Sequence, residues 1–233
     1  MKVVLYQTQP KRLIFQQNLN MIRLSDKQPF ASGEERDVYL HPEDDSKCIK
    51  ISNVSPSEGF RPKGLRDWLF WITRGCNNGY FDINYTDDLF CRQLSRRNDP
   101  EVFKHIPRCY GLVDTDLGKG LLCELIRNED GSPCITMKQY IQKHGAISDA
   151  KVIKAVDDFL NWLVVKNIFL REMGGTNTFF QYKNNGEVKL YHIDAVGCLD
   201  LIPLANYWDW FSRLRIRIKI NHLRRRKIKI RKT

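Results

Sequence analysis

The chain has 233 residues, 42% of them hydrophobic, and its 38 lysines and arginines against 27 acidic residues give a net charge of +11. A chain of this length and composition can bury about 70% of its unfolded surface, which excludes global disorder and the low-complexity classes. No stretch approaches the roughly 18 apolar residues that span a bilayer. The N-terminal segment lacks the continuous apolar centre of a secretory signal peptide, so we expect a cytoplasmic protein.

The first half of the chain predicts a small antiparallel sheet with one long connection. Short β-rich runs alternate with polar turns that contain Pro, Asp, Ser or Gly. Residues 53–86 hold prolines and glycines around one apolar patch and predict a connection with one short helix, and a further helix is expected over 87–97. The expected strands are residues 21–24, 38–40, 48–51, 110–113 and 121–126.

The second half of the chain predicts helices. Between Ser148 and Asn167 the apolar residues recur at i, i+1, i+4, i+7, i+8, i+11 and i+12, which is one face of an α-helix, and Ser148 is a suitable N-cap. Thr136 is expected to cap a shorter helix that runs through Lys143 and ends at Gly145.

A hairpin is expected after these helices. Two β-rich runs, residues 179–182 and 188–193, flank an Asn-Gly dipeptide at residues 185–186, which is the strongest short hairpin signal. If that dipeptide is a two-residue turn, Asn177 lies opposite Asp194, with Cα atoms about 4.5 to 5.5 Å apart. An amide oxygen and a carboxylate at that spacing could share one hard divalent cation such as Mg²⁺. In the alternative interpretation, both residues merely cap loop ends.

The cysteines and histidines point to no metal site. The seven cysteines include no C-x-x-C pair, and no two of the five histidines lie at metal-ligand spacing. We therefore expect reduced, mostly buried thiols and no zinc site.

The whole net charge lies in the last residues. Residues 213–233 hold eleven basic residues and no acid, which leaves 38 − 11 = 27 basic residues against 27 acidic ones in the rest of the chain. Such a block attracts phosphate on nucleic acid, anionic lipid or lipopolysaccharide. Its apolar residues scatter around a helical projection, which is not typical of a clean amphipathic membrane helix.

Two structures remain open for this basic tail. The alternation of apolar and basic residues over 214–220 fits a strand edge, or a helix whose aliphatic side packs on the body while the basic side chains reach outward. A solvated tail that aids solubility is the plainer alternative. The aromatic cluster at residues 206–211 is expected to pack in the core rather than to stack on bases.

The order of these features resembles a protein-kinase-like fold: a sheet lysine, an apolar helix, Arg171-Glu172 followed by Asn177, a hairpin and Asp194-x-x-Gly197. A closer similarity is to the YrbL-type PhoP regulatory network proteins of Gram-negative bacteria. The sequence segments that carry it are residues 31–42, 47–50, 110–122 and 193–197. The resemblance implies an α+β, two-lobed fold with a sheet lobe at 1–126, a helical lobe at 127–212 and a basic tail at 213–233.

The resemblance also implies a site for ATP and Mg²⁺. Lys50 would neutralise the α and β phosphates, and Glu172 would accept the proton of the substrate hydroxyl. The nucleotide would be covered by the turn at Gly33 and Arg36, and its adenine held by backbone groups at Glu124 and Ile126. The metal would be held by Asn177 and Asp194.

The chain departs from the usual kinase pattern in three places. Only one of the usual three glycines is present, the helix partner of Lys50 would be Asp87 or Asp88 instead of a glutamate, and Glu172 replaces an aspartate. The extra methylene of Glu172 moves its carboxylate by about 1.5 Å, where ~1 Å of misplacement can cost 10²-fold in rate.

Three functions follow from these features. The first is a phosphotransferase that acts on a hydroxyl of an envelope sugar or lipopolysaccharide-related molecule in a PhoP-controlled stress response, with the basic tail docking on an anionic substrate or on the inner membrane surface. The second is a pseudokinase, a regulatory or binding module without turnover. The third, for which no accompanying motif exists, is nucleic-acid binding through the tail.

Overall fold

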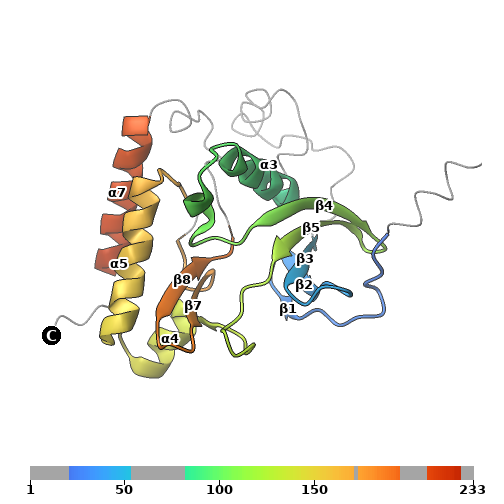
Figure 1. The fold of residues 1–233 in the computed structure, drawn as a ribbon, viewed down its shortest axis with the longest axis horizontal. Coiled ribbons are helices and arrows are strands. Elements are labelled where there is room, and N and C mark those ends of the chain that lie inside the picture. The colour runs from blue at the N-terminus through green and yellow to red at the C-terminus, as the bar shows by residue number, and fades with distance from the viewer. Residues whose placement is uncertain (1–20, 54–81, 171–172, 195–208, 227–233) are drawn as a thin grey trace, which may run out of the picture.

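The computed structural model describes residues 21–53, 82–170, 173–194 and 209–226 (Figure 1). Most of the connection predicted over 53–86 lies outside these ranges, as does Glu172. The described elements form a five-stranded sheet on one side and a helical part with a three-stranded sheet on the other. This is the α+β, two-lobed arrangement expected from the sequence, with the helix α3 between the third and fourth strands of the larger sheet.

The five-stranded sheet is antiparallel throughout, in the order β1-β2-β3-β5-β4. The strands are β1 (Ala31–Ser32), β2 (Arg36–Leu40), β3 (Lys47–Ser52), β4 (Cys109–Thr115) and β5 (Gly118–Glu124). Tyr39, Ile49 and Ile51 pack with Leu24 on one face, and Cys48, Leu121 and Cys123 pack on the other. The expected strand over 21–24 is wrong, since Ile22 makes only an isolated bridge to Thr115.

Gly120 lets the central strands approach each other closely. A Cβ atom at this position would lie 2.5 Å from Ile49 Cγ2 and 2.8 Å from Ile51 Cδ1, closer than real Cβ contacts. The glycine therefore keeps β3 tightly paired with β5, and Lys50 lies between the two isoleucines on the opposite face of β3.

Helix α3 (Ile83–Ser95) packs against β3, β4 and β5. It begins four residues before the predicted Asp87, because Asp82 caps it by accepting hydrogen bonds from the backbone N–H groups of Asn84 and Tyr85. A short 3-10 helix, η2 (Pro100–Phe103), leads from α3 to β4.

The helical part begins with two capped helices, α4 (Met137–His144) and α5 (Ala150–Val165). Thr136 and Gln139 form a capping box at the start of α4, and Gly145 ends it with φ of 77°, as predicted. The N-cap of α5 is Asp149 instead of Ser148, since the Asp149 carboxylate accepts from the N–H groups of residues 151 and 152.

The core of the helical part is formed by the apolar face of α5 together with the small sheet β6 (Ile135–Thr136), β7 (Thr178–Tyr182) and β8 (Val188–His192). Phe159, Leu163, Phe180 and Leu190 are almost fully buried in it. The apolar periodicity of α5 thus places it between the sheet and the last helix, as Figure 1 shows.

The last helix, α7 (Asp209–Arg226), settles the choice left open for residues 214–220 in favour of a helix. Ile216, Ile220 and Leu223 are buried, and α7 runs beside α5 (Figure 1). Trp210 belongs to the aromatic cluster that was expected to pack in the core, but 66% of its surface is exposed. Among the described helices, none is long and apolar enough to span a membrane.

The described cysteines are free thiols, as predicted. Burial raises the pKa of Cys48 to about 12 and that of Cys134 to about 11. Cys123 Sγ lies 3.7 Å from Cys109 Sγ across the β4–β5 pair. Two further cysteines of the sequence lie outside the described residues.

Candidate functional site

Lys50 lies on β3, and its side chain is buried although it carries a charge. Its Nζ atom donates a hydrogen bond of 2.6 Å to the backbone carbonyl of Ile193 and lies 3.8 Å from Asp194 Oδ1. A buried ammonium needs such partners because it has lost its water. The structure therefore brings Lys50 and Asp194 together, although 144 positions separate them in the sequence.

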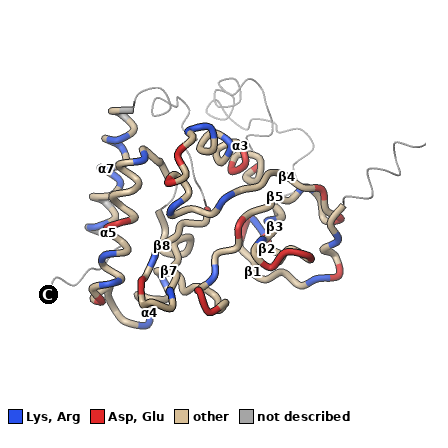
Figure 2. Tube along the Cα trace, viewed as in Figure 1, with Lys and Arg blue, Asp and Glu red and all other residues tan. Residues whose placement is uncertain are grey.

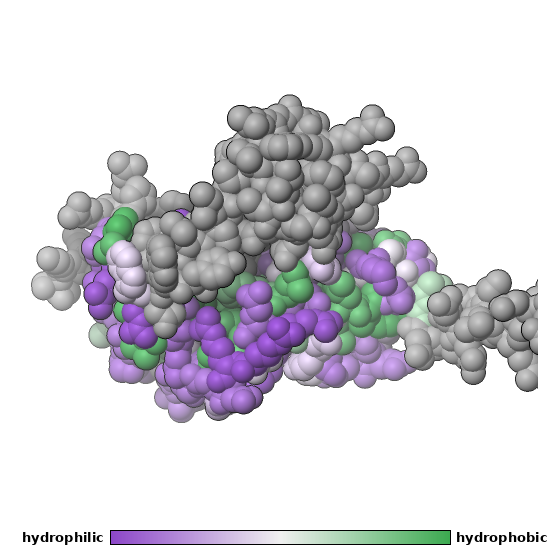
Figure 3. Space-filling model, turned by 90° about the horizontal axis from the view of Figure 1, so that it is seen from above, coloured by the Kyte–Doolittle hydropathy of each residue, from purple (hydrophilic) through white to green (hydrophobic). Residues whose placement is uncertain are grey.

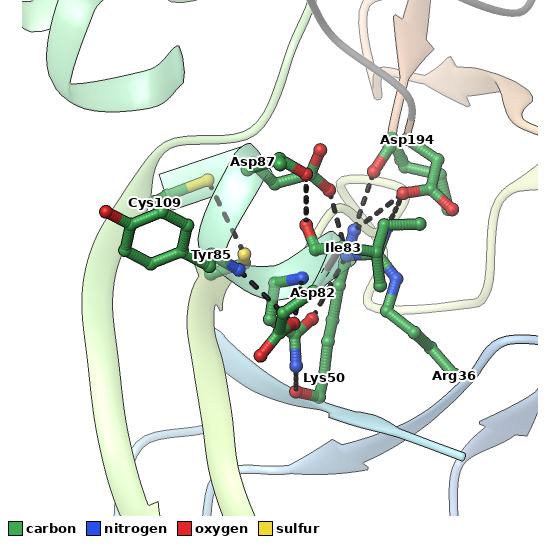
Figure 4. Close-up of polar contacts among 12 residues, drawn as sticks. Arg36, Lys50, Asp82, Ile83, Tyr85, Asp87, Cys109 and Asp194 are labelled. Atoms are coloured by element: carbon green, nitrogen blue, oxygen red, sulfur yellow. Dashed lines mark hydrogen bonds and ion pairs between the residues drawn. The ribbon is translucent and has the colours of Figure 1, made fainter. Parts of the chain in front are cut away.

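Arg36 places a second buried cation beside Lys50 (Figure 4). In the register of β2 and β3, Val38 pairs with Lys50, so Arg36 lies one diagonal step away on the same face. Its Nη1 atom donates to Asp87 Oδ2 at 2.8 Å, and its Nη2 atom pairs with Asp194 Oδ1. The guanidinium therefore bridges helix α3 and the segment that directly follows β8.

Helix α3 is tied to the sheet at its first turn. Because Asp82 fixes the start of the helix, Asn84 and Asp87 lie three residues apart on the same face. The Asn84 side chain accepts from Arg36 Nη1 at 3.2 Å and donates from Nδ2 to the Lys50 carbonyl at 3.0 Å. The cap of α3 thus positions the polar side chains that hold both cationic residues.

Asp87 and Asp88 were the two candidates for the acidic partner of Lys50. In the structure Asp87 binds Arg36, and Asp88 binds Arg92 on the same helix at 2.8 Å. Arg36 therefore makes the ion pair that joins the sheet to helix α3. An arginine offers a long side chain with a planar fork of donors, which suits the short reach of an aspartate.

Arg36, Lys50, Asp87 and Asp194 form what we call the charge quartet. Two cations face two carboxylates, so the quartet is formally neutral. Side-chain exposure is 5%, 8% and 8% for the first three residues and 28% for Asp194. Asp194 is thus the most exposed member of the quartet, and its carboxylate is the one that solvent contacts most.

The hairpin brings Asn177 near Asp194, but in a different register from the predicted one. Thr178 pairs with His192, and the Ile193 N–H donates to the Asn177 carbonyl at 3.0 Å. Asn177 therefore lies opposite Ile193, and the prediction that it lies opposite Asp194 is wrong by one residue.

The difference in register arises in the turn. The loop has three residues, Asn184 to Gly186, since Lys183 N–H donates to the Glu187 carbonyl at 2.9 Å. Gly186 adopts φ of 76°, the left-handed conformation that such a loop requires. Three-residue and two-residue loops both use an Asn-Gly pair, so the dipeptide alone does not fix the register.

A cavity of about 710 Å³ joins the sheet to the hairpin and holds five of the predicted site residues. Such a volume lies within the range of about 300 to 1,000 Å³ that is usual for small-ligand sites. Polar and charged residues from both lobes meet there. The cavity is lined by Ala31, Ser32, Gly33, Glu34, Glu35, Arg36, Val38, Lys50, Ile83, Thr176, Asn177, Ile193 and Asp194.

The turn between β1 and β2 borders this cavity, but its backbone is partly engaged. Gly33 N–H donates to the Arg36 carbonyl at 2.9 Å, so that donor closes the turn. Asn53 Nδ2 donates to the Gly33 carbonyl at 3.2 Å. Glu34 and Glu35 add two carboxylates at the turn, where the resemblance places a phosphate-covering loop.

The structure does not bring Glu124 and Ile126 to the cavity, since neither is among the described residues that line it. Glu124 N–H donates to the Arg108 carbonyl at 2.9 Å, and Leu125 N–H donates to the Ser46 carbonyl at 2.8 Å. Glu124 Oε2 accepts from Arg108 N–H at 3.1 Å. These bonds fix the path of the chain between the two lobes.

The structure adds one polar residue to the predicted site, and one predicted residue lies outside the described ranges. Glu172 was predicted as the base, and it lies outside the described residues. Asn84 was not predicted, because it falls in the segment assigned to the long connection. The helix-start signal is Asp82, since an aspartate at the N-cap accepts hydrogen bonds from the backbone N–H groups two and three residues later.

Comparison with known proteins adds a family match. Over residues 22–228 the chain matches the family model described as PhoP regulatory network protein YrbL. Similar curated proteins are the uncharacterized protein YrbL of Escherichia coli (strain K12) and that of Shigella flexneri. Each is 28% identical over 191 residues, which cover 82% of this chain and 80% of the relative.

Solved structures show weaker likenesses. Rad53 1-466 in complex with AMP-PNP has 14% identity and a TM-score of 0.43, and the match covers 73% of this chain and 38% of that one. WbdD with the kinase inhibitor LY294002 has 10% identity and a TM-score of 0.37, with 81% and 37% covered. The chain thus spans less than half the length of either solved chain.

Proposed function

The chain belongs to the family described as PhoP regulatory network protein YrbL, and on that premise we propose that it is a kinase-like phosphotransferase that uses ATP and Mg²⁺. The observation that carries the proposal is the meeting of Arg36 and Lys50 from the sheet with Asp194 and Asn177 from the hairpin in one cavity. Phosphoryl transfer requires cations around the phosphates and oxygen ligands for a metal, and this cavity offers both.

The chemistry of the donors fits a hard divalent cation. Asp194 and Asn177 would hold Mg²⁺, because carboxylate and amide oxygens are the ligands that this ion prefers. Bound Mg-ATP would supply the phosphoryl group, with the ion neutralising its charge. Lys50 and Arg36 would contact the phosphates. Arg36 then has to loosen its contact with Asp194 Oδ1, since that oxygen already pairs with the guanidinium.

The reaction itself is the finer part of the proposal. Glu172 would accept the proton of the acceptor hydroxyl. The acceptor would be an envelope sugar or lipopolysaccharide-related molecule handled in a PhoP-controlled stress response. Its anionic groups would be attracted by the basic residues of 213–233, at the inner surface of the membrane.

A pseudokinase is the second candidate function, and the charge quartet favours it. Asp194 is already paired with two cations, and Glu34 and Glu35 place negative charge beside the phosphate position. A chain with these features could bind nucleotide and partners without turnover. Nucleic-acid binding through the basic tail is a third candidate, supported by charge alone.

Thermal unfolding with and without ligand tests nucleotide binding. At a hundredfold excess over the dissociation constant, ATP with Mg²⁺ should stabilise the protein by about 2.7 kcal/mol, which raises the melting temperature by roughly 5 to 10 °C. Lys50→Met should abolish this increase, and Asp194→Asn should abolish the part that depends on Mg²⁺. Lys119→Met is the control, since that lysine is exposed and pairs only with the exposed Asp114 in the described contacts.

Transfer of labelled γ-phosphate to lipopolysaccharide fragments separates the first two functions. Transfer that is lost in Asp194→Asn supports the phosphotransferase. Stabilisation by nucleotide without transfer supports the pseudokinase. If the melting temperature is unchanged by ATP, with or without Mg²⁺, the nucleotide site itself is refuted.

A further inference from the structure

Helix α7 carries two separate apolar faces. One packs on α5 and consists of the buried residues Ile216, Ile220 and Leu223. The other, which we call the outer stripe, consists of Trp210, Leu214 and Ile218, which are 66%, 46% and 60% exposed. At about 100° per residue, the outer stripe spans about 80° of the helix and lies roughly 150° away from the buried face.

The two faces explain why a helical projection of this segment shows no single apolar side. The buried face packs α7 on α5, whereas the three residues of the outer stripe are exposed. Exposed apolar residues that line up on one helix face commonly mark an interaction site. Figure 3 shows apolar and hydrophilic residues side by side at the end of the molecule that carries α5 and α7.

Basic residues border the outer stripe on both sides. Arg213 and Arg217 are exposed and lie on one side of it, at about 20° to 60° from Trp210 around the helix. Arg215 and Lys219 lie on the other side. Figure 2 shows basic positions distributed along the length of α7.

The body of the protein fixes the direction in which the stripe points. The Arg215 guanidinium lies 4.8 Å from the centre of the Phe169 ring, and Lys219 Nζ donates to the Leu170 carbonyl at 2.5 Å. Near the other end of α7, Arg224 Nη2 pairs with Asp157 of α5 at 2.8 Å. These contacts flank the buried face of α7 on its two sides, so the outer stripe lies on the side of the helix opposite that face, where its three residues are exposed.

We infer that the outer stripe docks α7 onto a membrane surface rich in anionic phospholipid, with the helix lying in the plane of the interface. The apolar side chains would enter the boundary between headgroups and acyl chains, where tryptophan is especially favoured. Arg213 and Arg217 would contact lipid phosphates, and each cation near such a surface strengthens binding about fivefold. The inference specifies the surface behind the membrane association proposed above, and it requires no turnover.

Charge favours a bilayer over other occupants of the stripe. A second copy of the chain docking on this face would bring Arg213 and Arg217 against the same residues of its partner, and residues 213–233 contain no acid to offset them. A nucleic acid would use the arginines but leave Trp210, Leu214 and Ile218 in water. An anionic bilayer satisfies the charged and the apolar residues together.

Sedimentation of the full chain with lipid vesicles, without nucleotide, tests the inference. The two preparations are phosphatidylcholine alone and phosphatidylcholine mixed with phosphatidylglycerol. We expect binding to the mixed vesicles, part of which persists at high salt because the stripe is inserted. The triple variant W210Q/L214Q/I218Q should lose the salt-resistant part, with at least a tenfold weaker affinity. Its melting temperature should match that of the wild type, since glutamine favours helices and the three positions are exposed.

The variant R213Q/R217Q and a matched control separate charge from insertion. R213Q/R217Q should bind roughly tenfold or more weakly at low salt and depend less steeply on salt. The control L117Q/K119Q removes an exposed leucine and an exposed lysine at the β4–β5 turn and should bind as the wild type does. Quenching of tryptophan fluorescence by brominated acyl chains should fall in Trp210→Phe.

Three results would overturn the inference. The first is equal salt-resistant binding by the wild type and the stripe variant. The second is absence of vesicle binding together with a dimer that the stripe variant loses, which assigns the face to a second copy. The third is preferential binding of duplex nucleic acid that the stripe variant retains. None of these results depends on ATP, so failure of the docking surface and failure of the kinase proposal are distinguishable.

Discussion

The ion pair between Arg36 and Asp87 should show a large energetic coupling. Its atoms are 2.8 Å apart, and the two side chains are 5% and 8% exposed. Removing one partner of a buried pair leaves an uncompensated charge and typically costs about 3 to 5 kcal/mol. We therefore expect Asp87→Asn to reduce the free energy of unfolding by about 3 kcal/mol. Arg36→Met should cost at least as much, because it also leaves Asp194 without that cation.

The double variant R36M/D87N should be much less destabilised than the sum of the single variants. It carries neither charge of the pair, so its loss should be about 3 to 4 kcal/mol, and the coupling between the two sites about 2 to 3 kcal/mol. Urea unfolding monitored by circular dichroism measures all four proteins. The dependence of the free energy on urea should stay the same, which indicates an unchanged denatured state.

An exposed ion pair provides the reference for this cycle. Lys154 and Asp158 lie 3.0 Å apart on α5, with side chains 77% and 50% exposed. Their coupling should stay below about 0.5 kcal/mol, since solvent screens an exposed pair. If the Arg36 and Asp87 effects add to within about 0.5 kcal/mol, or if their coupling is no larger than that of the exposed pair, the buried quartet does not hold the sheet to helix α3 in the way described.

The pKa of the His105 imidazole is lowered from 6.5 to about 4 by burial, so it stays neutral in the folded protein while the unfolded chain takes up a proton below pH 6.5. Stability should therefore fall as pH drops from about 6.5 towards 4. The variant His105→Asn keeps a donor for the Leu190 carbonyl. Between pH 7 and pH 5, its free energy of unfolding in urea titrations should fall by about 2 kcal/mol less than that of the wild type. An equal fall in both proteins would contradict this explanation. Cys48, whose pKa is about 12, should resist a thiol reagent at pH 8 until denaturant is added, whereas rapid modification of the native protein would show that it is accessible. Gly120→Ala should lower the free energy of unfolding by about 1 to 3 kcal/mol, because the added methyl group overpacks β3 against β5. Gly33→Ala is the control, since its new Cβ atom would meet the Arg36 carbonyl at an ordinary 3.4 Å. Calorimetry should show a clearly smaller effect for Gly33→Ala.

Local signals in the sequence predict the elements well where one residue type decides the outcome. Thr136 and Gly145 bound helix α4 because a capping box and a left-handed glycine act over a few residues. The N-cap of α5 is not decided by the local sequence, since Ser148 and Asp149 are adjacent and both are good caps. Aspartate accepts two backbone N–H groups here, and the helix starts after it.

The candidate site is less predictable, because it depends on contacts between distant residues. Lys50 could be identified from its strand, but the pairing of Arg36 with Asp87 spans 51 positions and leaves no local pattern. The register of the hairpin depends on whether the loop has two or three residues, and both loops accept Asn-Gly. One residue of difference there decides whether Asn177 faces Asp194 or Ile193.

The contacts of Lys50 with Ile193 and of Arg36 with Asp194 cross from the sheet to the hairpin, and both end on consecutive residues of the chain. Any hinge opening that separates the lobes to admit or release a bound molecule must break this pair of bridges at the same time. Breaking the ion pair between Arg36 and Asp194 would then limit the rate of ligand exchange. Because salt screens ion pairs, the exchange rate would rise with ionic strength even if the affinity for the ligand did not change.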